Sequence, residues 1–161
     1  MLKYVDYDIV FQEIPDEVTL AVNLSNCPYR CKGCHSPYLQ KDIGRELNES
    51  ALAGLLQSYE RAITCICFMG GDADTGGLYR LADFVRKSQG GRIKTAWYSG
   101  NNRLPANSKD HFDFVKTGPY IEILGGLNKN TTNQRLYRIE DDNMIDITHR
   151  MYAVAQNNQL I

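Results

Sequence analysis

Short apolar segments alternate with helix-like stripes along this chain, and this alternation constrains its fold more than any other feature. Strand-like segments occur at residues 17–24, 62–68, 93–98 and 112–116. Between the first three of them, apolar residues recur at helical spacing, namely Leu52, Leu55, Leu56 and Tyr59, then Leu78, Leu81, Ala82 and Val85. Strands that alternate with helices predict an α/β domain with a parallel sheet and right-handed crossovers. The sequence from residue 121 onward is less regular.

Length and charge narrow the class further. A chain of 161 residues suits one domain. Lys and Arg number 18, Asp and Glu number 19, and the net charge is −1, which excludes a strongly basic nucleic-acid-binding protein. No apolar stretch approaches the ~20 residues that span a bilayer, and the first residues lack a signal-peptide pattern. We therefore expect a cytoplasmic protein that binds neither nucleic acid nor membrane.

The five cysteines fall into two groups. Cys27, Cys31 and Cys34 lie within one eight-residue stretch, whereas Cys65 and Cys67 lie in the second strand-like segment. An odd number of cysteines without an export signal disfavours a disulfide framework. Because they are two residues apart on a strand, Cys65 and Cys67 share one face. We expect both to be small buried residues.

The spacing Cys27-x3-Cys31-x2-Cys34 is typical of metal or redox chemistry in a cytosolic protein. Structural zinc usually takes four protein ligands, and His35 is a poor fourth because adjacent residues rarely reach one tetrahedral ion. Three thiolates on a short loop instead suit a cubane 4Fe-4S cluster that leaves one iron without a protein ligand. An open iron is a place for chemistry, as the open position of catalytic zinc is. A zinc site completed by a cysteine of the second group stays open as an alternative.

Glycine and polar residues follow each strand-like segment. The cysteine loop follows the first, Gly70-Gly71-Asp72 the second, Ser99-Gly100 the third and Thr117-Gly118-Pro119 the fourth. The carboxyl ends of parallel strands share one edge of a sheet, and ligands bind at that edge in α/β folds. Glycines let the backbone approach a ligand closely. Asp72 has a simpler alternative role as the N-cap of the following helix.

These motifs carry a family resemblance. The cysteine spacing after the first strand, followed by Phe68-Met69-Gly70-Gly71-Asp72 after the second, resembles the signature of radical S-adenosylmethionine (SAM) enzymes. Four further segments are similar to the activating proteins of anaerobic ribonucleotide reductase: Gly33-Cys34-His35-Ser36-Pro37, Trp97-Tyr98-Ser99-Gly100, Lys116-Thr117-Gly118-Pro119-Tyr120 and Thr132-Asn133-Gln134-Arg135. The resemblance spans nearly the whole chain. It departs from the family at Asn130-Thr131-Thr132, where the family has a Gly-Ser-Ser-like run, and this leaves the role of both threonines open.

The resemblance implies a fold, an activity and partners. The fold would be a single radical SAM domain over residues 1–161, an incomplete TIM-like (β/α) barrel of parallel strands. The activity would be reductive cleavage of SAM at a 4Fe-4S cluster, followed by removal of a hydrogen atom from a glycine of the anaerobic ribonucleotide reductase. The partners would be that reductase and a low-potential electron donor such as flavodoxin or ferredoxin. The rivals are an activase of another glycyl-radical enzyme and a non-enzymatic zinc-binding module.

The resemblance also assigns residues to the cluster and to SAM. Cys27, Cys31 and Cys34 would ligate the cluster and so serve as the catalytic residues. The backbone of Gly33-Cys34-His35 would lie beside the SAM adenine. The backbone of Gly70-Gly71-Asp72 would bind the methionyl ammonium, with Asp72 adding a nearby negative charge.

Three further assignments concern residues later in the chain. Ser99 would reach the ribose hydroxyls of SAM. Lys116 would face either the SAM carboxylate or the solvent. The segment 132–135 would form part of a docking surface for the partner, or else satisfy backbone groups of an irregular loop.

Overall fold

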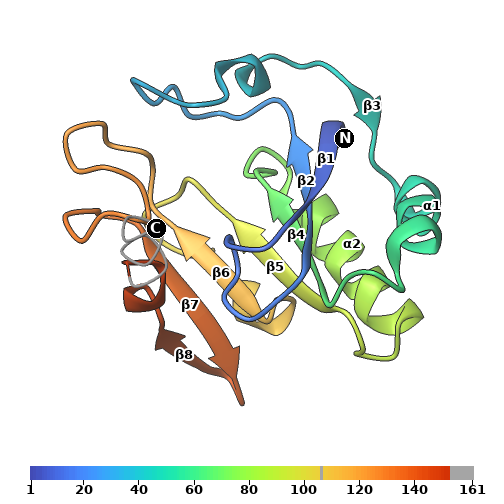
Figure 1. The fold of residues 1–161 in the computed structure, drawn as a ribbon. Helices are drawn as coiled ribbons and strands as arrows, with labels where there is room; N and C mark the ends of the chain where they lie inside the picture. Colours follow the sequence, from blue (N-terminus) through green and yellow to red (C-terminus); the bar gives the residue numbers. More distant parts are fainter. Residues whose placement is uncertain (106, 153–161) are drawn as a thin grey trace.

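The computed structural model describes residues 1–105 and 107–152, and within them eight strands form one sheet. In chain order the strands are β1 (Lys3–Val10), β2 (Thr19–Leu24), β3 (Arg45–Glu46), β4 (Cys65–Met69), β5 (Lys94–Tyr98), β6 (Phe114–Thr117), β7 (Arg135–Glu140) and β8 (Asn143–Asp146). The main helices are α1 (Glu49–Tyr59), α2 (Thr75–Ser88) and the short 3-10 segments η1 (Pro37–Gln40) and η2 (Ser108–Asp110) (Figure 1). The four predicted strands and both predicted helices are confirmed at slightly shifted bounds. The last part of the predicted domain, residues 153–161, lies outside the described residues.

The sheet is mixed, with its parallel part in the centre. Its strand order is β3-β1-β2-β4-β5-β6-β7-β8. The three pairings among β2, β4, β5 and β6 are parallel. The four pairings outside them are antiparallel. The predicted incomplete TIM-like barrel of parallel strands is therefore wrong.

The reason lies in the strands that flank the parallel centre. A (β/α) barrel closes by adding further parallel strands, each joined through a helix. Here β1 runs back against β2 and β7 runs back against β6, so antiparallel strands occupy both positions where a barrel would continue. The sheet ends instead at two edges, β3 and β8 (Figure 1).

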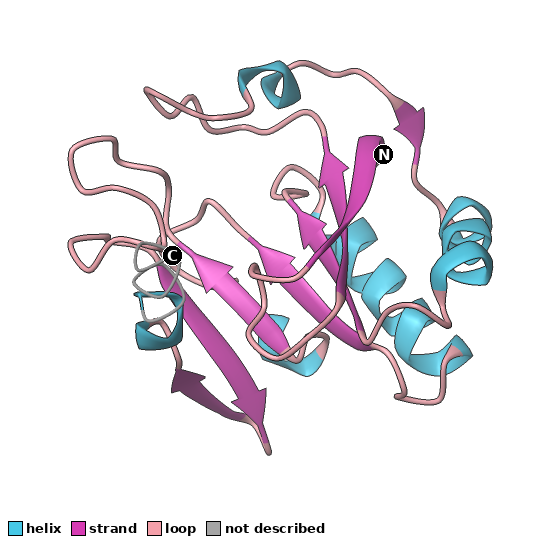
Figure 2. Cartoon of the chain, viewed as in Figure 1, coloured by secondary structure: helices cyan, strands magenta, loops and turns pink. Residues whose placement is uncertain are grey.

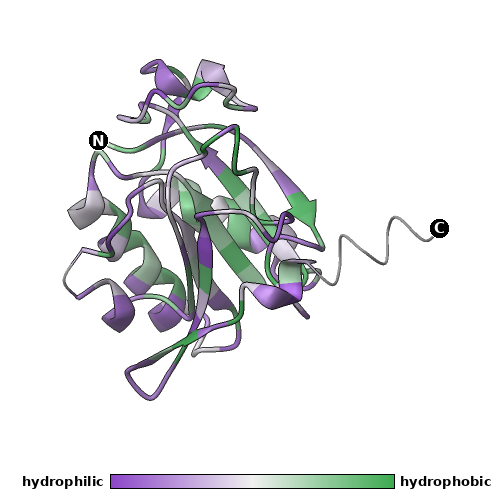
Figure 3. Cartoon of the chain, turned by 90° about the vertical axis from the view of Figure 1, so that its left-hand side faces the viewer, coloured by the Kyte–Doolittle hydropathy of each residue, from purple (hydrophilic) through white to green (hydrophobic). Residues whose placement is uncertain are grey.

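Helices α1 and α2 cover one face of the sheet and bury the larger part of the core (Figure 2). Helix α1 begins at its N-cap Asn48, whose side chain accepts a hydrogen bond from Ala51 N at 2.9 Å. The two predicted apolar stripes face the strands, and Figure 3 shows hydrophobic residues gathered between the helices and the sheet. They pack on alternate strand residues, among them Ile66, Phe68 and Trp97. In the described ranges, no helix combines the length and hydropathy needed to cross a membrane.

The opposite face of the sheet carries a smaller core. It combines strand residues such as Cys65, Cys67 and Leu136 with Ile14 from the β1–β2 loop and Met151 near the end of the described chain. Cys65 and Cys67 are fully buried on this shared face, which confirms the prediction for them. Burial raises the pKa of both thiols far above its usual range. Burial thus favours the neutral thiol at both positions, as expected for structural buried cysteines.

Candidate metal centre

The loops that follow the four parallel strands meet at one edge of the sheet and line a cleft. The arrowheads of these strands point to that edge in Figure 1. The cleft has a volume of about 230 Å³. Its walls carry the three clustered cysteines together with residues from the ends of the other strands, notably Gly70, Asp72, Gly100, Lys116 and Gly118. The structure thus brings most of the predicted site residues together.

The cysteine loop, which follows β2, is braced by backbone hydrogen bonds. Cys27 N donates to Leu39 O at 2.9 Å, and Cys34 N closes a turn onto Cys31 O at 3.2 Å. Arg30 Nη1 donates to Cys27 O at 2.8 Å, so this cation supports the loop that carries the thiols. All three cysteines are half-buried free thiols. The loop therefore presents three potential metal ligands to one cleft.

Tyr29, between the first two cysteines, holds the loop against the end of β5. A Cβ atom at Gly100 would lie only 2.7 Å from the Tyr29 ring. Glycine at position 100 is therefore what allows the ring to pack there. No role for Tyr29 was predicted from the sequence, in which its position between two motif cysteines is the one signal.

The Cys27 thiol lies close to several negative groups of the cleft. Burial raises the pKa of the Cys27 thiol, and the negative charges of Asp72, Cys31 and Cys34 add to this effect. A bound metal cluster would offset that repulsion by stabilising the thiolates. Across residues 1–105 and 107–152, no three His, Cys, Asp or Glu side chains are gathered tightly enough to hold one metal ion. In a 4Fe-4S cluster each cysteine binds a different iron, and three half-buried free thiols that line one cleft are a donor set of this chemistry.

The turn after β4 depends on glycine. Gly70 and Gly71 have φ angles of +107° and +92°, which L side chains rarely adopt. A Cβ atom at Gly71 would lie 3.0 Å from Leu24 Cδ1 and 3.3 Å from Leu78 Cδ1. Packing against the core behind the turn therefore requires glycine at 71, whereas Gly70 lines the cleft in front.

Asp72 links the ends of two neighbouring strands. Its carboxylate accepts hydrogen bonds from Ser99 Oγ and from Gly100 N, the latter at 3.2 Å. Burial raises the pKa of Asp72, while these two hydrogen bonds and the Lys116 charge oppose the rise. The Ser99 oxygen is fully buried and also accepts from Asn101 N at 3.0 Å. Ser99 therefore holds Asp72 in place, and its contact with a ribose stays a prediction.

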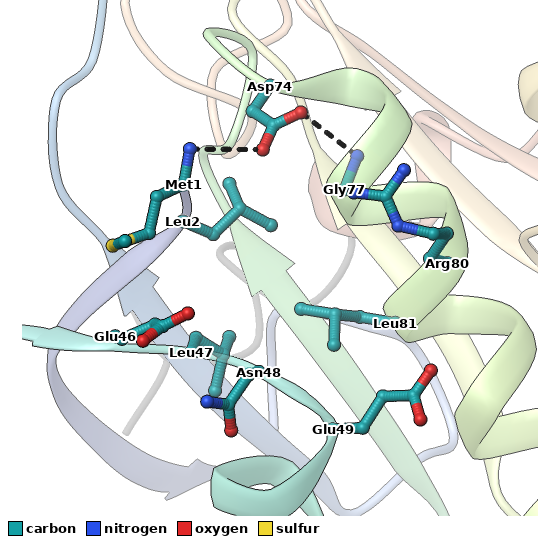
Figure 4. Close-up of a pocket in the computed structure, with 10 residues that line it drawn as sticks. All are labelled: Met1, Leu2, Glu46, Leu47, Asn48, Glu49, Asp74, Gly77, Arg80 and Leu81. Atoms are coloured by element: carbon teal, nitrogen blue, oxygen red, sulfur yellow. Dashed lines mark hydrogen bonds and ion pairs between the residues drawn. The ribbon is translucent and has the colours of Figure 1, made fainter.

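Asp74, not Asp72, caps helix α2. Its Oδ1 accepts a hydrogen bond from Gly77 N at 3.0 Å, and its other oxygen lies 3.4 Å from the amino group of Met1 (Figure 4). The alternative role of Asp72 as the N-cap is therefore wrong. The pocket beside Asp74 has a volume of about 220 Å³, and none of the residues that line it is a cysteine. Asp72 instead lines the cleft that contains the three cysteines.

Lys116, on β6, brings a cation into the cleft. Its Nζ donates to Ser99 O and to Gly118 O, both at 3.0 Å. Burial lowers the pKa of Lys116 to about 8, although the negative charge of Asp72 opposes the shift. The amine is therefore still mostly protonated at neutral pH, with a third N–H free for a ligand. Lys116 was predicted to face either the SAM carboxylate or the solvent. It is buried and lines the cleft, and its contact with SAM stays a prediction.

A second branch of the cleft, with a volume of about 480 Å³, adjoins the first at Lys116. His35 is exposed on this branch, with its ring centroid 5.2 Å from that of Tyr120. Gly33 has a φ of +76°, and a Cβ atom there would lie 3.0 Å from Glu122 Cδ. The loop that follows β6 therefore touches the cysteine loop at two points. Contact of Gly33-Cys34-His35 with adenine stays a prediction.

The segment predicted either to dock a partner or to satisfy an irregular backbone mainly does the latter. The side chains of Thr132, Asn133 and Gln134 donate to carbonyl oxygens of the loop after β6, at 3.0, 3.0 and 3.3 Å. Gln134 in addition lines both branches of the cleft. Arg135 is half-exposed and lies 3.8 Å from an aspartate of β8. Within this segment, Gln134 lines the cleft and Arg135 lies on the surface, so these two residues are the ones that another molecule could contact.

The fold and the site together place three potential cluster ligands on one loop, at the edge of a mixed sheet where the parallel strands end. A family model described as a 4Fe-4S single cluster domain matches residues 17–140, which include the three cysteines, the glycine turn and Lys116. The chain belongs to this family and is an iron–sulfur protein. Comparison with curated proteins and with solved structures gives no match.

Gly71 offers a direct test of the packing behind the turn. We expect Gly71→Ala to lower the free energy of unfolding by about 3 kcal/mol, because backbone strain and contact with two leucines add up. Gly91→Ala is the matched control, since Gly91 has a similar φ of +78° but nothing within 4 Å of its Cβ position; it should cost about 1 kcal/mol. Urea unfolding of the cluster-free protein measures both, and equal losses would contradict the packing argument.

Proposed function

We propose that this iron–sulfur domain is a radical SAM activase that cleaves SAM reductively and removes a hydrogen atom from a glycine of an anaerobic ribonucleotide reductase. The observation that carries the proposal is the composition of one cleft. Three thiols, a glycine turn with a half-buried carboxylate, and a buried lysine line it together. The sequence resemblance to activating proteins supplies the reaction, and the family match supports the cluster.

The charged groups of the cleft suit the methionyl part of SAM. This part carries an ammonium and a carboxylate on one carbon, so its site needs an acceptor and a cation near each other. Asp72 and Lys116 supply these charges, and each shifts the pKa of the other. The third N–H of Lys116 is free to donate to a carboxylate, and such charge-assisted hydrogen bonds are about twice as strong as neutral ones.

When bound, the cluster supplies the electron that splits the sulfonium C–S bond of SAM into methionine and a 5′-deoxyadenosyl radical. The protein's part is to bind and orient. Cys27, Cys31 and Cys34 would hold the cluster. Lys116 would fix the carboxylate end of SAM. The second branch, beside His35 and Tyr120, would admit the glycine loop of the partner.

The test is formation of a glycyl radical on the partner. Reduced, reconstituted protein is mixed with SAM and the anaerobic reductase, and electron paramagnetic resonance should show an organic doublet. The doublet should disappear when the radical glycine of the reductase is replaced by alanine, and when the activase carries Cys31→Ala. Arg135→Ala should lower the radical yield more than the SAM affinity if Arg135 contacts the partner.

The same experiment separates the rivals. A doublet on pyruvate formate-lyase but not on the reductase would transfer the proposal to another glycyl-radical enzyme. SAM binding without a radical on either partner would contradict the activase function. Zinc in place of iron and sulfide after anaerobic reconstitution would favour the non-enzymatic module.

A further inference from the structure

Trp97 contacts the glycine turn from behind. It is the single tryptophan of the chain, lies in β5 and is fully buried. Its Nε1 donates a hydrogen bond to Gly70 O at 2.8 Å. Its ring is held by Tyr79 of α2, edge-on with centroids 6.1 Å apart, and by Phe112, at 5.5 Å. The indole is therefore fixed on the helix-covered side of the sheet, with its N–H aimed at the turn.

The turn needs such a fixed point because two glycines in sequence allow many backbone conformations. Hydrogen bonds hold its two ends: Gly70 N donates to Tyr98 O at 3.0 Å, and Asp74 N donates to Gly71 O at 3.1 Å. The peptide between Gly70 and Gly71 has the indole as the partner of its carbonyl. In a planar trans peptide the C=O and N–H point in opposite directions. Holding the Gly70 carbonyl toward Trp97 therefore also sets the direction of the Gly71 N–H.

We propose that Trp97 is a positioning residue for ligand binding: its indole N–H locks the Gly70–Gly71 peptide, and thereby the backbone that faces the methionyl group in the cleft. This inference rests on the proposed function, because it takes SAM as the ligand of the first branch. Trp97 itself does not line either branch. It acts through Gly70 and Asp72, which do line the first branch.

The test removes the N–H and keeps the ring. Because Trp97 is the single tryptophan, growth of a tryptophan auxotroph on β-(3-benzothienyl)alanine replaces this residue alone, with sulfur in place of the N–H. The substitution Trp97→Phe, which can be encoded in the gene, also removes the N–H and keeps an aromatic ring. At matched iron content, we expect SAM affinity in both to fall about tenfold, as expected when a buried acceptor loses its donor. In the cluster-free forms, hydrogen exchange of the segment 69–73 should be faster than in the wild type.

Leu52→Ala is the matched control, since Leu52 of α1 is fully buried in the same core but belongs neither to the turn nor to the aromatic group around Trp97. It should lower the melting temperature but change the SAM affinity less than about twofold. Unchanged affinity in the benzothienyl protein, or an equal affinity loss in Leu52→Ala, would overturn the positioning role. Failure of the wild-type protein to bind SAM would instead overturn the proposed function, so the two failures are distinguishable.

Discussion

Alanine at Cys27, Cys31 or Cys34 is expected to abolish loading of the 4Fe-4S cluster, whereas alanine at Cys65 or Cys67 leaves it intact. The first three thiols are half-buried and line one cleft. The other two are fully buried on the far face of the sheet, where burial keeps them protonated. A cluster that loses one of three protein thiolates has only two left, which is too few to retain it.

The measurement is iron and sulfide content after anaerobic reconstitution, together with the visible charge-transfer absorption. Cys65→Ala and Cys67→Ala are the controls for general damage, and should lower the melting temperature while keeping full iron content. Wild-type iron content in Cys31→Ala would contradict the ligand assignment. Loss of the cluster in Cys67→Ala at an unchanged melting temperature would show that a fourth thiol takes part.

Replacement of Lys116 by methionine is expected to weaken SAM binding by roughly ten- to a hundredfold, the range for loss of a hydrogen bond to a charged group. The lysine already has two carbonyl partners, so its third N–H adopts a fixed direction into the cleft. Methionine fills a similar volume without a charge. Iron content should not change, because Lys116 is not a cluster ligand.

The same lysine gives SAM binding a pH dependence with a definite sign. Burial lowers the pKa of Lys116 to about 8 in the cluster-free chain, and an anionic cluster would raise it again. A carboxylate binds the protonated amine, so affinity is retained below this pKa and decreases as the pH rises through it. Lys116→Arg stays charged throughout and should lack this decrease.

SAM has an amino group of its own that titrates, but it does so in both proteins, and the difference between them isolates Lys116. Lys94→Met serves as the control for a lost lysine. Lys94 pairs with Glu17 at the opposite edge of the sheet, so SAM affinity should not change. Parallel pH profiles for the wild type and Lys116→Arg would show that Lys116 does not bind the carboxylate.

The central strands could be predicted because burial on both faces makes them nearly continuous apolar runs. Cys65–Met69 is the example, and the helices on either side of it show clear 3.6-residue stripes. The outer strands lack this signal. β1 has acidic residues at Asp6 and Asp8, and β7 and β8 are joined by a turn in which Asp141 and Asp142 adopt positive φ without any glycine. The resemblance implied a barrel, and the strands that could be recognised are all parallel; the antiparallel pairing on both sides of them is a tertiary property that local sequence does not show.

For the site, local sequence identified the potential cluster ligands but not their neighbours. The cysteine spacing and the glycine turn are contiguous motifs, so each could be recognised alone. The link from Ser99 to Asp72, the packing of Tyr29 on Gly100 and the leucines behind Gly71 join residues far apart in sequence. Such contacts follow from strand register, which no single motif encodes.

The placement of all three cysteines on one loop has a consequence for the order of biogenesis. The potential cluster ligands lie within residues 27–34. Their loop is closed by a backbone hydrogen bond that Cys27 N donates to Leu39 O. Closing so short a loop costs little chain entropy and is fast. The other walls of the cleft come from strands up to Gln134, and they form only after the parallel register is complete. The loop that carries the three thiols can therefore close before the other walls of the cleft are in place.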